Sequence, residues 1–233
     1  MTISEKIEKI EFRLFSPNLI KKMAVMKIIT PELYDADGYP VEGGLTDPKM
    51  GVIDPGLRCR TCGGRVKECP GHFGYIELAR PVIHLKFVPW IYNFLRCTCY
   101  ECGRILMKPD DIEKWKKKLK KIEKERGTHA KWEYTSNIVR KIKNVKVCPY
   151  CKTEQKKIKH ERPTTFIEGK KKLTPIDIRI RLEKIPDEDC ELLGLNWTAG
   201  RPEWMILPLL PVPPSTMRPS ITLESGQRSE DDL

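Results

Sequence analysis

The sequence of 233 residues lacks any long hydrophobic run. Its longest apolar stretch, "MILPLLPVP" from Met205 to Pro213, is broken by prolines, whereas a membrane-spanning helix needs about 20 apolar residues. The opening residues, "MTISEKIEKIEF", carry acidic side chains and no apolar segment, so no signal peptide is predicted. We therefore expect a cytoplasmic protein (nuclear if the source is eukaryotic) that does not bind a membrane and whose thiols stay reduced.

Motifs of catalysis are also missing. The sequence has no glycine-rich phosphate loop, no H-E-x-x-H motif, no nucleophile elbow and no convincing pair of carboxylates. We therefore predict no catalytic residue in this chain.

Charge of the two signs is unequal, with 43 Lys and Arg against 32 Asp and Glu, a formal net charge of +11. A basic surface of this kind favours a polyanionic partner such as nucleic acid. A lysine-rich solvated surface is the equally simple alternative. The densest basic stretch, Lys116–Lys121, leaves open whether it contacts DNA, another protein or only water.

Cysteine, by contrast, is plentiful, and nine cysteines in a reducing compartment suggest metal ligands rather than disulfides. The segment "CRTCGGRVKECPGHFG" combines a C-x-x-C pair with a C-x-x-H pair. The four candidate ligands are Cys59, Cys62, Cys69 and His72. Zinc takes thiolate sulfur and imidazole nitrogen in a tetrahedron, and four protein ligands leave no open position. We therefore predict a structural zinc here, because a chance set of buried cysteines explains this spacing poorly.

A second site is predicted from two further C-x-x-C pairs. Its candidate ligands are Cys99, Cys102, Cys148 and Cys151. The long gap between the pairs is filled by a self-contained helical segment, and a folded insertion brings its ends together without the entropy cost of closing a flexible loop.

Two cysteines remain outside these sets. Cys97 stands close enough to Cys99 to offer a third sulfur, but it ends an apolar stretch and is interpreted as a packed side chain. Cys190 is interpreted as a core thiol. A redox role for the C-x-x-C pairs is possible in principle, yet it explains neither His72 nor the grouping into two sets.

The elements expected from the sequence are mixed. A strand is predicted over Ile7–Phe15, followed by a helix capped by Ser16. A helical insertion should start at Pro109 and close at Gly127, with a shorter second helix after it. Thr174 should cap another helix, and the residues from Arg201 onward should be loop-like.

We divide the chain into segments 1–50, 51–107, 108–147, 148–210 and 211–233. The fold class is α+β: an irregular, zinc-stabilised assembly with short strands and a helical insertion.

Longer motifs now identify a family. "GVIDPG", "CRTCGGRVKECPGHFGYIELARPVIH", "CTCYECGRIL" and "RPEWMILPLLPVPPSTMRPSI" together resemble the N-terminal region of the largest subunit of cellular RNA polymerase, of the archaeal and eukaryotic type. The resemblance covers nearly the whole chain and is least distinctive over residues 110–170. The bacterial type differs, with a differently spaced set of four cysteines.

The resemblance implies a clamp domain, a mobile wall that closes over the DNA–RNA hybrid and whose head holds two structural Zn²⁺ ions. It also implies that "RPSITLESGQRSEDDL" is a lid that helps to part RNA from template, with Arg218 and Arg228 as candidates for phosphate contact. The equally simple alternative is that both arginines pair with Glu224, Glu230 or Asp231 of the same chain. The implied partners are the second-largest subunit, the C-terminal half of the largest subunit, the stalk, template DNA and the DNA–RNA hybrid. A NusG-type elongation factor or an initiation factor is a further partner implied for the clamp.

In that family the catalytic Mg²⁺ is held by an N-A-D-F-D-G-D motif, which this sequence lacks. We therefore expect a fragment of a longer nucleotidyltransferase subunit, inactive by itself, with Mg²⁺ only in the complete enzyme. Two alternatives belong to other classes. A free-standing zinc-ribbon nucleic-acid-binding protein would bind a preferred sequence unaided, and a zinc or thiol enzyme would require an open metal position.

Overall fold

The computed structural model describes residues 7, 10, 12–142, 145–218, 221–222 and 228–229. The chain divides into two compact units, each discontinuous in sequence. The large unit comprises Met1–Ser16 with Pro81–Ile206, and the small unit comprises Pro17–Arg80 with Leu207–Leu233. The five sequence segments proposed above remain a prediction. No helix in the described part of the chain has both the length and the apolar content to cross a membrane.

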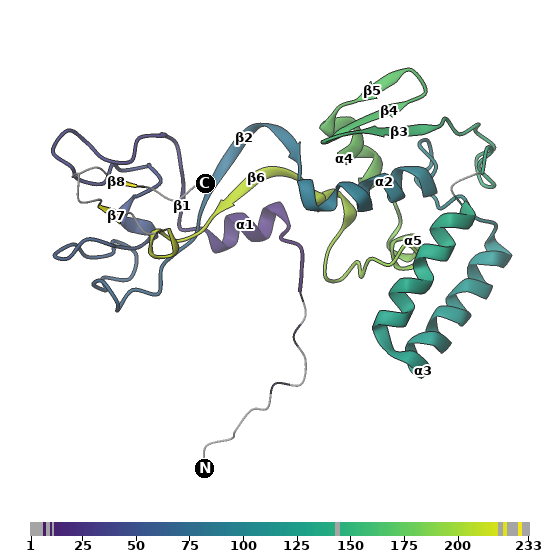
Figure 1. The fold of residues 1–233 in the computed structure, drawn as a ribbon, viewed down its shortest axis with the longest axis horizontal. Coiled ribbons are helices and arrows are strands. Elements are labelled where there is room, and N and C mark those ends of the chain that lie inside the picture. The colour runs from purple at the N-terminus through teal and green to yellow at the C-terminus, as the bar shows by residue number, and fades with distance from the viewer. Residues whose placement is uncertain are drawn as a thin grey trace, which may run out of the picture. The chain divides into compact units, whose positions relative to one another are not determined.

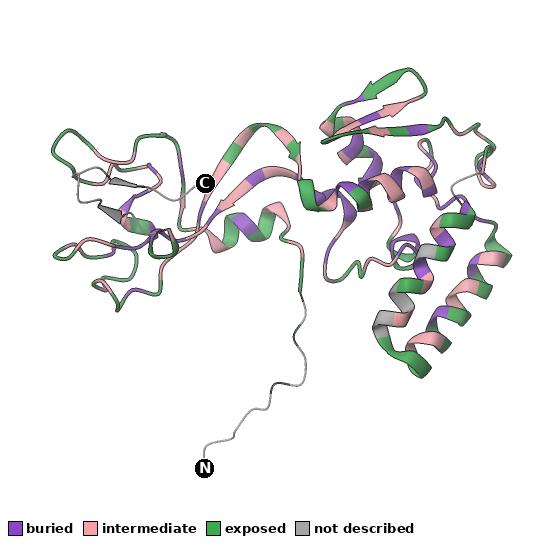
Figure 2. Cartoon of the chain, in the orientation of Figure 1, coloured by how far each residue is buried: buried purple, intermediate pink, exposed green. Residues whose placement is uncertain are grey.

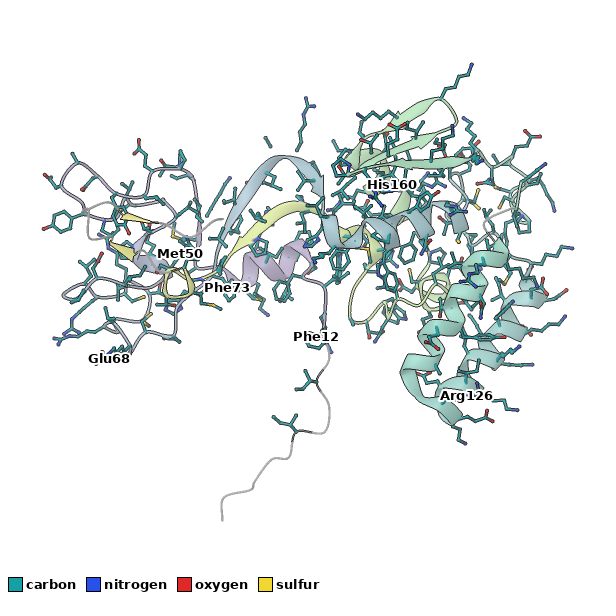
Figure 3. The ribbon with its side chains drawn as sticks, in the orientation of Figure 1. Phe12, Met50, Glu68, Phe73, Arg126 and His160 are labelled. Atoms are coloured by element: carbon teal, nitrogen blue, oxygen red, sulfur yellow. The ribbon has the colours of Figure 1, made fainter. Side chains whose placement is uncertain are left out.

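The small unit is built around a three-stranded sheet of order β1–β2–β6 (Figure 1). Its elements are α1 (Pro17–Met23), β1 (Met26–Lys27), η1 (Pro48–Met50), β2 (Gly74–Ile83, which ends in the large unit), β6 (Ile206–Val212, which begins there), η4 (Ser215–Met217), β7 (Ile221–Thr222) and β8 (Arg228–Ser229). Strands β1 and β2 run parallel, with Met26 opposite Gly74. A small core of Ile28, Met50 and Val212 packs here (Figure 3 labels Met50), so this unit has few buried apolar side chains.

The large unit holds most of the hydrophobic core. Its elements are η2 (Leu85–Phe87), α2 (Val88–Cys97), α3 (Pro109–Ile142), β3 (Ile158–Glu161), β4 (Thr165–Glu168), β5 (Lys171–Leu173), α4 (Pro175–Glu183), α5 (Asp187–Leu192) and η3 (Pro202–Met205). Strands β3, β4 and β5 form an antiparallel meander. Buried residues of α2, α4 and α5 share one core cluster with the meander and α3 (Figure 2).

Several predicted elements are confirmed. The insertion is a pair of helical arms, labelled together as α3, with Gly127 between them at φ 81° and Arg126 at the tip (Figure 3). Its second arm is longer than predicted. In the first arm, Ile112 and Leu119 are buried, as their spacing indicates. Thr174 caps α4 through a reciprocal capping box with Asp177.

Two predictions of local structure are wrong. The described residues of the predicted N-terminal strand have no regular structure: Phe12 is 93% exposed, and the Leu14 N–H donates to the Ala199 carbonyl at 2.9 Å instead of to a strand. The segment after Arg201 is not a loop, because residues 206–212 form β6. Its prolines are tolerated because β6 lies at the edge of the sheet, where a missing N–H need not break a ladder.

Candidate metal centres

The first cysteine cluster lies in the small unit and brings together the four side chains expected from the sequence. The sulfur atoms of Cys59, Cys62 and Cys69 and a ring nitrogen of His72 all lie within 4.8 Å of one another. Cys59 and Cys69 are buried, whereas Cys62 is exposed. Four soft ligand atoms this close together can all bind one tetrahedral zinc ion.

All three Cys-x-x-C turns share one backbone pattern. The N–H after the second cysteine donates to the carbonyl of the first, and the first cysteine N–H donates to the carbonyl two residues after the second. The donor–acceptor pairs are Gly63–Cys59, Cys59–Gly64, Gly103–Cys99, Cys99–Arg104, Lys152–Cys148 and Cys148–Thr153, with N···O distances of 2.8–3.1 Å. The residue after the second cysteine has positive φ, 73° in Gly63, 73° in Gly103 and 62° in Lys152. Glycine adopts this conformation freely, so the glycines follow from the turn.

Hydrogen bonds to sulfur prepare the first cluster for a cation. The Thr61 N–H donates to Cys59 Sγ and the Gly71 N–H donates to Cys69 Sγ, both at 3.4 Å. Burial opposes ionisation of Cys59, but the N–H groups of Cys62 and Thr61 hold its pKa below the ordinary value. Burial raises the pKa of Cys69 to about 11. Metal binding would displace the remaining thiol protons and pull these sulfurs to the same charged state.

An orphaned atom tests whether this donor set fits a metal. Among the described residues, His72 Nε2 is a buried side-chain nitrogen with no hydrogen-bond partner. Such a buried polar atom is costly unless something pairs with it. A zinc ion held by the three thiolates and His72 Nε2 would satisfy that atom, so the residues present fit zinc.

The second cluster lies in the large unit and joins two hairpin turns. Its four sulfurs, from Cys99, Cys102, Cys148 and Cys151, also lie within 4.8 Å of one another. The Sγ atoms of Cys99 and Cys151 are 3.5 Å apart, and those of Cys102 and Cys148 are 3.7 Å apart. Disulfide sulfurs lie about 2.05 Å apart, whereas Zn–S bonds of about 2.3 Å at the tetrahedral angle separate sulfurs by about 3.8 Å. The spacing therefore fits a four-cysteine zinc site.

Polar neighbours that sequence reasoning missed surround this second cluster. The Gln155 amide nitrogen donates to Cys99 Sγ at 3.3 Å, and the Thr153 hydroxyl oxygen lies 3.2 Å from Cys151 Sγ. The Thr153 side chain and N–H lower the pKa of Cys151 to about 6, whereas burial raises the pKa of Cys102 to about 12. The signal in the sequence was weak: Thr153 and Gln155 are simply the polar residues two and four places after Cys151.

Charged side chains connect the hairpin of Cys99 and Cys102 to the rest of the large unit. Arg104 Nε donates to Asp189 at 2.8 Å, and its guanidinium lies 4.7 Å from the centre of the Tyr150 ring in the other hairpin. Arg181, only 7% exposed, donates to Glu168 and to the carbonyls of residues 95 and 98, the latter directly before Cys99. The second cluster is therefore held by protein contacts as well as by its sulfurs.

The two remaining cysteines stand apart from both clusters. Cys97 and Cys190 are fully buried in the large core, and neither belongs to a group of possible ligands in the described residues. Burial raises the pKa of each thiol to about 12. Both are therefore protonated packing groups, as their sequence context predicts.

The arginines predicted to contact phosphate are placed unequally. Arg218 donates to the backbone carbonyls of Leu45 at 2.7 Å and Pro213 at 3.1 Å, so its guanidinium ties the start of the tail to the small unit. The side chain of Arg228 lies outside the described residues, as do positions 219–220, 223–227 and 230–233 of the lid-like segment. Its contact with phosphate stays a prediction.

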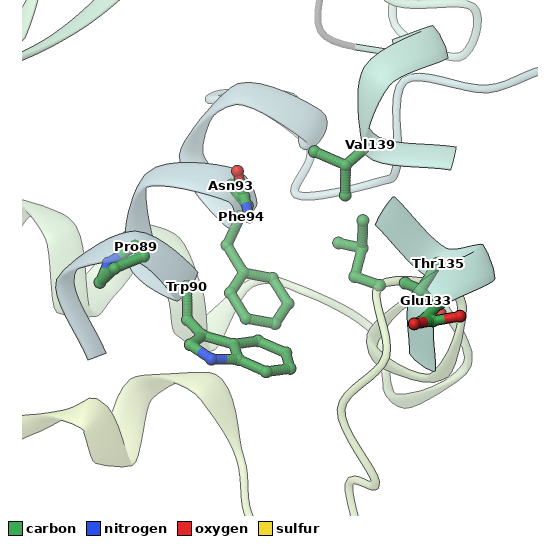
Figure 4. Close-up of a pocket in the computed structure, with 8 residues that line it drawn as sticks. Pro89, Trp90, Asn93, Phe94, Glu133, Thr135 and Val139 are labelled. Atoms are coloured by element: carbon green, nitrogen blue, oxygen red, sulfur yellow. The ribbon is translucent and has the colours of Figure 1, made fainter. Parts of the chain in front are cut away.

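A pocket of about 470 Å³ in the large unit is a concave feature of a different kind (Figure 4). Its lining comprises Pro89, Trp90, Asn93, Phe94, Glu133, Thr135, Val139 and Leu193. Glu133 is its one ionisable side chain, and no group of possible metal ligands in the described residues includes a lining residue. The cysteine clusters therefore carry the functional argument.

Comparison with known proteins identifies the family. The family described as RNA polymerase Rpb1, domain 1, matches residues 4–233. The chain belongs to this family. The DNA-directed RNA polymerase subunit Rpo1N of Methanocaldococcus jannaschii is 53% identical over 99% of the chain, which covers 17% of that relative. The Rpo1N subunits of Methanothermobacter thermautotrophicus strain Delta H and Thermoplasma acidophilum are each 52% identical, over 99% and 100% of the chain.

The resemblance seen in the sequence is thus confirmed at the level of family and subunit. The chain corresponds to the N-terminal part of the largest RNA polymerase subunit of the archaeal type, and it spans 17–27% of the length of these three curated relatives. Both cysteine clusters lie inside the matched residues. This member of the Rpb1 domain 1 family therefore has two compact candidate zinc sites, one in each unit.

Proposed function

We propose that this chain is the clamp portion of a DNA-directed RNA polymerase, helping to enclose DNA and the DNA–RNA hybrid during transcription. The observation that carries the proposal is the family match over residues 4–233, which includes all eight clustered ligands. The chain acts as a shaped wall. Nucleotide addition takes place at the Mg²⁺ site of the complete enzyme, and this chain supplies no residue to it.

Each cluster holds one structural zinc in this proposal. Cys59, Cys62, Cys69 and His72 hold the first, and Cys99, Cys102, Cys148 and Cys151 hold the second. When bound, zinc supplies a rigid cross-link between the turns that carry its ligands. With four protein ligands at each ion, no position remains for water or substrate, which favours scaffolding over hydrolysis.

Its partners are the other polymerase subunits, template DNA and the DNA–RNA hybrid. The exposed lysines of α3, among them Lys117, Lys120 and Lys121, give the surface the positive charge that phosphate backbones attract. Such contacts position nucleic acid without reading bases. The chain alone should therefore bind DNA weakly, with an affinity that falls as salt rises and is indifferent to sequence. Tight binding to one sequence in moderate salt would instead support a free-standing zinc-ribbon protein.

The lid assignment is tested in the complete polymerase with Arg228→Ala. If Arg228 contacts phosphate at the upstream end of the hybrid, the variant should add nucleotides normally but separate transcript from template less well. Hybrid length on a bubble template measures this directly. An unchanged hybrid, with the transcript displaced as in the parent enzyme, would remove Arg228 from the proposal and leave the clamp assignment intact.

A further inference from the structure

Residues 214–218, here called the tail segment, lead into the lid-like segment. They pack against the first cysteine cluster within the small unit. Gly71, between the ligands Cys69 and His72, has φ 82°, and a Cβ placed on it would lie 2.5 Å from Pro214 Cβ and 2.5 Å from Thr216 Oγ1. Ordinary carbon–carbon contacts are about 3.5–4.0 Å. The absence of a side chain at position 71 therefore lets the tail segment lie directly on the cluster.

A second turn, at Gly51, lies against the same residues. A Cβ on Gly51 would lie 3.2 Å from Ser215 Oγ and 3.3 Å from Thr216 Cγ2, and Gly51 itself lies close to Gly71. The preceding residue, Met50, accepts a hydrogen bond from the His72 N–H at 2.9 Å. The ligand His72 is thus tied to the turn on which the tail segment rests.

The tail segment is ordered by its own short helix. Within η4, the Met217 N–H donates to the Pro214 carbonyl at 2.9 Å and the Arg218 N–H donates to the Ser215 carbonyl at 3.1 Å. Ser215 is 2% exposed, and Arg218 anchors the end of the helix to the Leu45 carbonyl. Residues 214–218 therefore form one ordered turn that rests on Gly51 and Gly71.

We propose that the first cluster is the footing of the lid-like segment, and that Gly71 is a positioning residue for transcript displacement. The zinc-held turn fixes Gly71, Gly71 seats Pro214 and Thr216, and these position Arg218, at which the lid-like segment begins. This inference rests on the proposed function for its lid, but the packing it invokes is independent of that assignment.

A matched pair of glycine substitutions tests the inference in the complete polymerase. Gly63 lies in the same cluster with φ 73°, and a Cβ there meets nothing within 4 Å. Gly71→Ala and Gly63→Ala therefore carry similar backbone strain, but only Gly71→Ala forces the tail segment away, by about 1 Å. We expect amides 217 and 218 to exchange hydrogen about tenfold faster in Gly71→Ala and at the parent rate in Gly63→Ala.

The functional readout separates positioning from general damage. Gly71→Ala should change hybrid length and transcript displacement, while the rate of nucleotide addition stays within about twofold of the parent. Gly63→Ala should change neither. A loss of nucleotide addition in proportion to displacement would mean a merely structural defect and would overturn the positioning role.

Zinc content, measured on the same samples, keeps the outcomes distinct. If Gly71→Ala loses zinc and amides 217 and 218 lose protection together, the footing is supported, because the ion and the tail respond as one. If both amides keep the parent exchange rate in Gly71→Ala, with or without zinc, the inference is wrong. Faster exchange with an unchanged hybrid would instead retain the footing and reject the lid.

Discussion

The two cysteine clusters are similarly compact but have very different surroundings. The first draws all its ligands from residues 59–72 and shares its core cluster with few apolar side chains, chiefly Val52, Leu57 and Val66. The second joins turns on either side of α3, and its Cys99 and Cys148 lie in the large core. Metal binding should therefore supply most of the folding free energy of the first cluster and only part of that of the second. The reason is that buried apolar area is the alternative source of stability.

The largest expected effect is that of metal removal. Purified chain should contain about two zinc ions, and chelation should unfold residues 52–73, because zinc binding in such small domains supplies about 10–16 kcal/mol of folding free energy. The turns of the second cluster should keep partial protection through the Arg104 and Arg181 contacts. Metal analysis and hydrogen exchange before and after chelation measure both effects.

Cys59→Ser should reproduce the first half of that result alone, leaving about one zinc per chain. Equal loss of protection in both clusters after chelation would contradict the comparison. A single zinc in the parent chain would remove the second site.

The next largest effect concerns the protein contacts behind the second cluster. Arg181→Met would leave the half-buried carboxylate of Glu168 without its cation. It would also leave the carbonyls of Leu95 and Thr98 without their donor. Removing one partner of a buried ion pair costs about 3–5 kcal/mol, and urea denaturation of the zinc-loaded chain measures it. Protection of the first cluster should not change.

Lys116→Met is the control for Arg181→Met, because Lys116 pairs with Glu188 at an exposed position. It should cost about 0–1 kcal/mol. Equal costs for the two variants would show that the buried arginine does not support the second cluster.

A smaller effect is expected at the start of α4, whose C-cap residue Lys184 lies against Gly103. The Thr174 N–H and hydroxyl hold the pKa of Asp177 below its ordinary value of 3.8. Asp177→Ala should lower the free energy of unfolding by about 1 kcal/mol near neutral pH.

The pH dependence of that deficit has a defined sign. Since the folded pKa of Asp177 is depressed, its contribution is present above pH about 4 and is lost as pH falls through the folded value. The gap between parent and Asp177→Ala should therefore close in acid, as judged from the difference in unfolding free energy at pH 6 and pH 3. A gap that widens in acid would exclude the capping interaction as its source.

The smallest effect is predicted for Cys97→Ser, which should leave the zinc content unchanged. Cys97 Sγ points toward the Val139 carbonyl at 3.9 Å and belongs to neither cluster. Loss of zinc from this variant would mean that Cys97, and not one of the four assigned cysteines, completes the second site.

The members of the two cysteine clusters could be predicted because most of the information for each turn is local. Each C-x-x-C turn needs a positive φ at one residue, and the glycines at 63 and 103 announce it. The helix start at Thr174 is equally local, because Asp177, the partner of Thr174 in the capping box, lies only three residues away. Ligand type, spacing and turn residues agree in each cluster, and this agreement is what allowed the clusters to be predicted from the sequence.

The unpredicted features depend on partners distant in sequence. Alternating Ile10, Phe12 and Leu14 show which side chains a strand could bury, but not whether a neighbouring strand exists to pair with. Residues 206–212 read as a loop because of their prolines, and only their place at the edge of a sheet makes a strand possible. Arg181 and Asp189 carry no local sign of burial, since their partners lie up to 86 residues away.

The split of the small unit has a consequence for the order in which the chain is made. The ribosome completes the ligand set of the first cluster at His72, but Pro214 and Thr216, which rest on Gly71, are translated only after the whole large unit. At about 5–20 residues per second, that interval is roughly 10–30 s. During it the nascent first cluster has its metal ligands but not the segment that covers them. Capture of zinc on the ribosome would therefore precede, and prepare, the arrival of the tail.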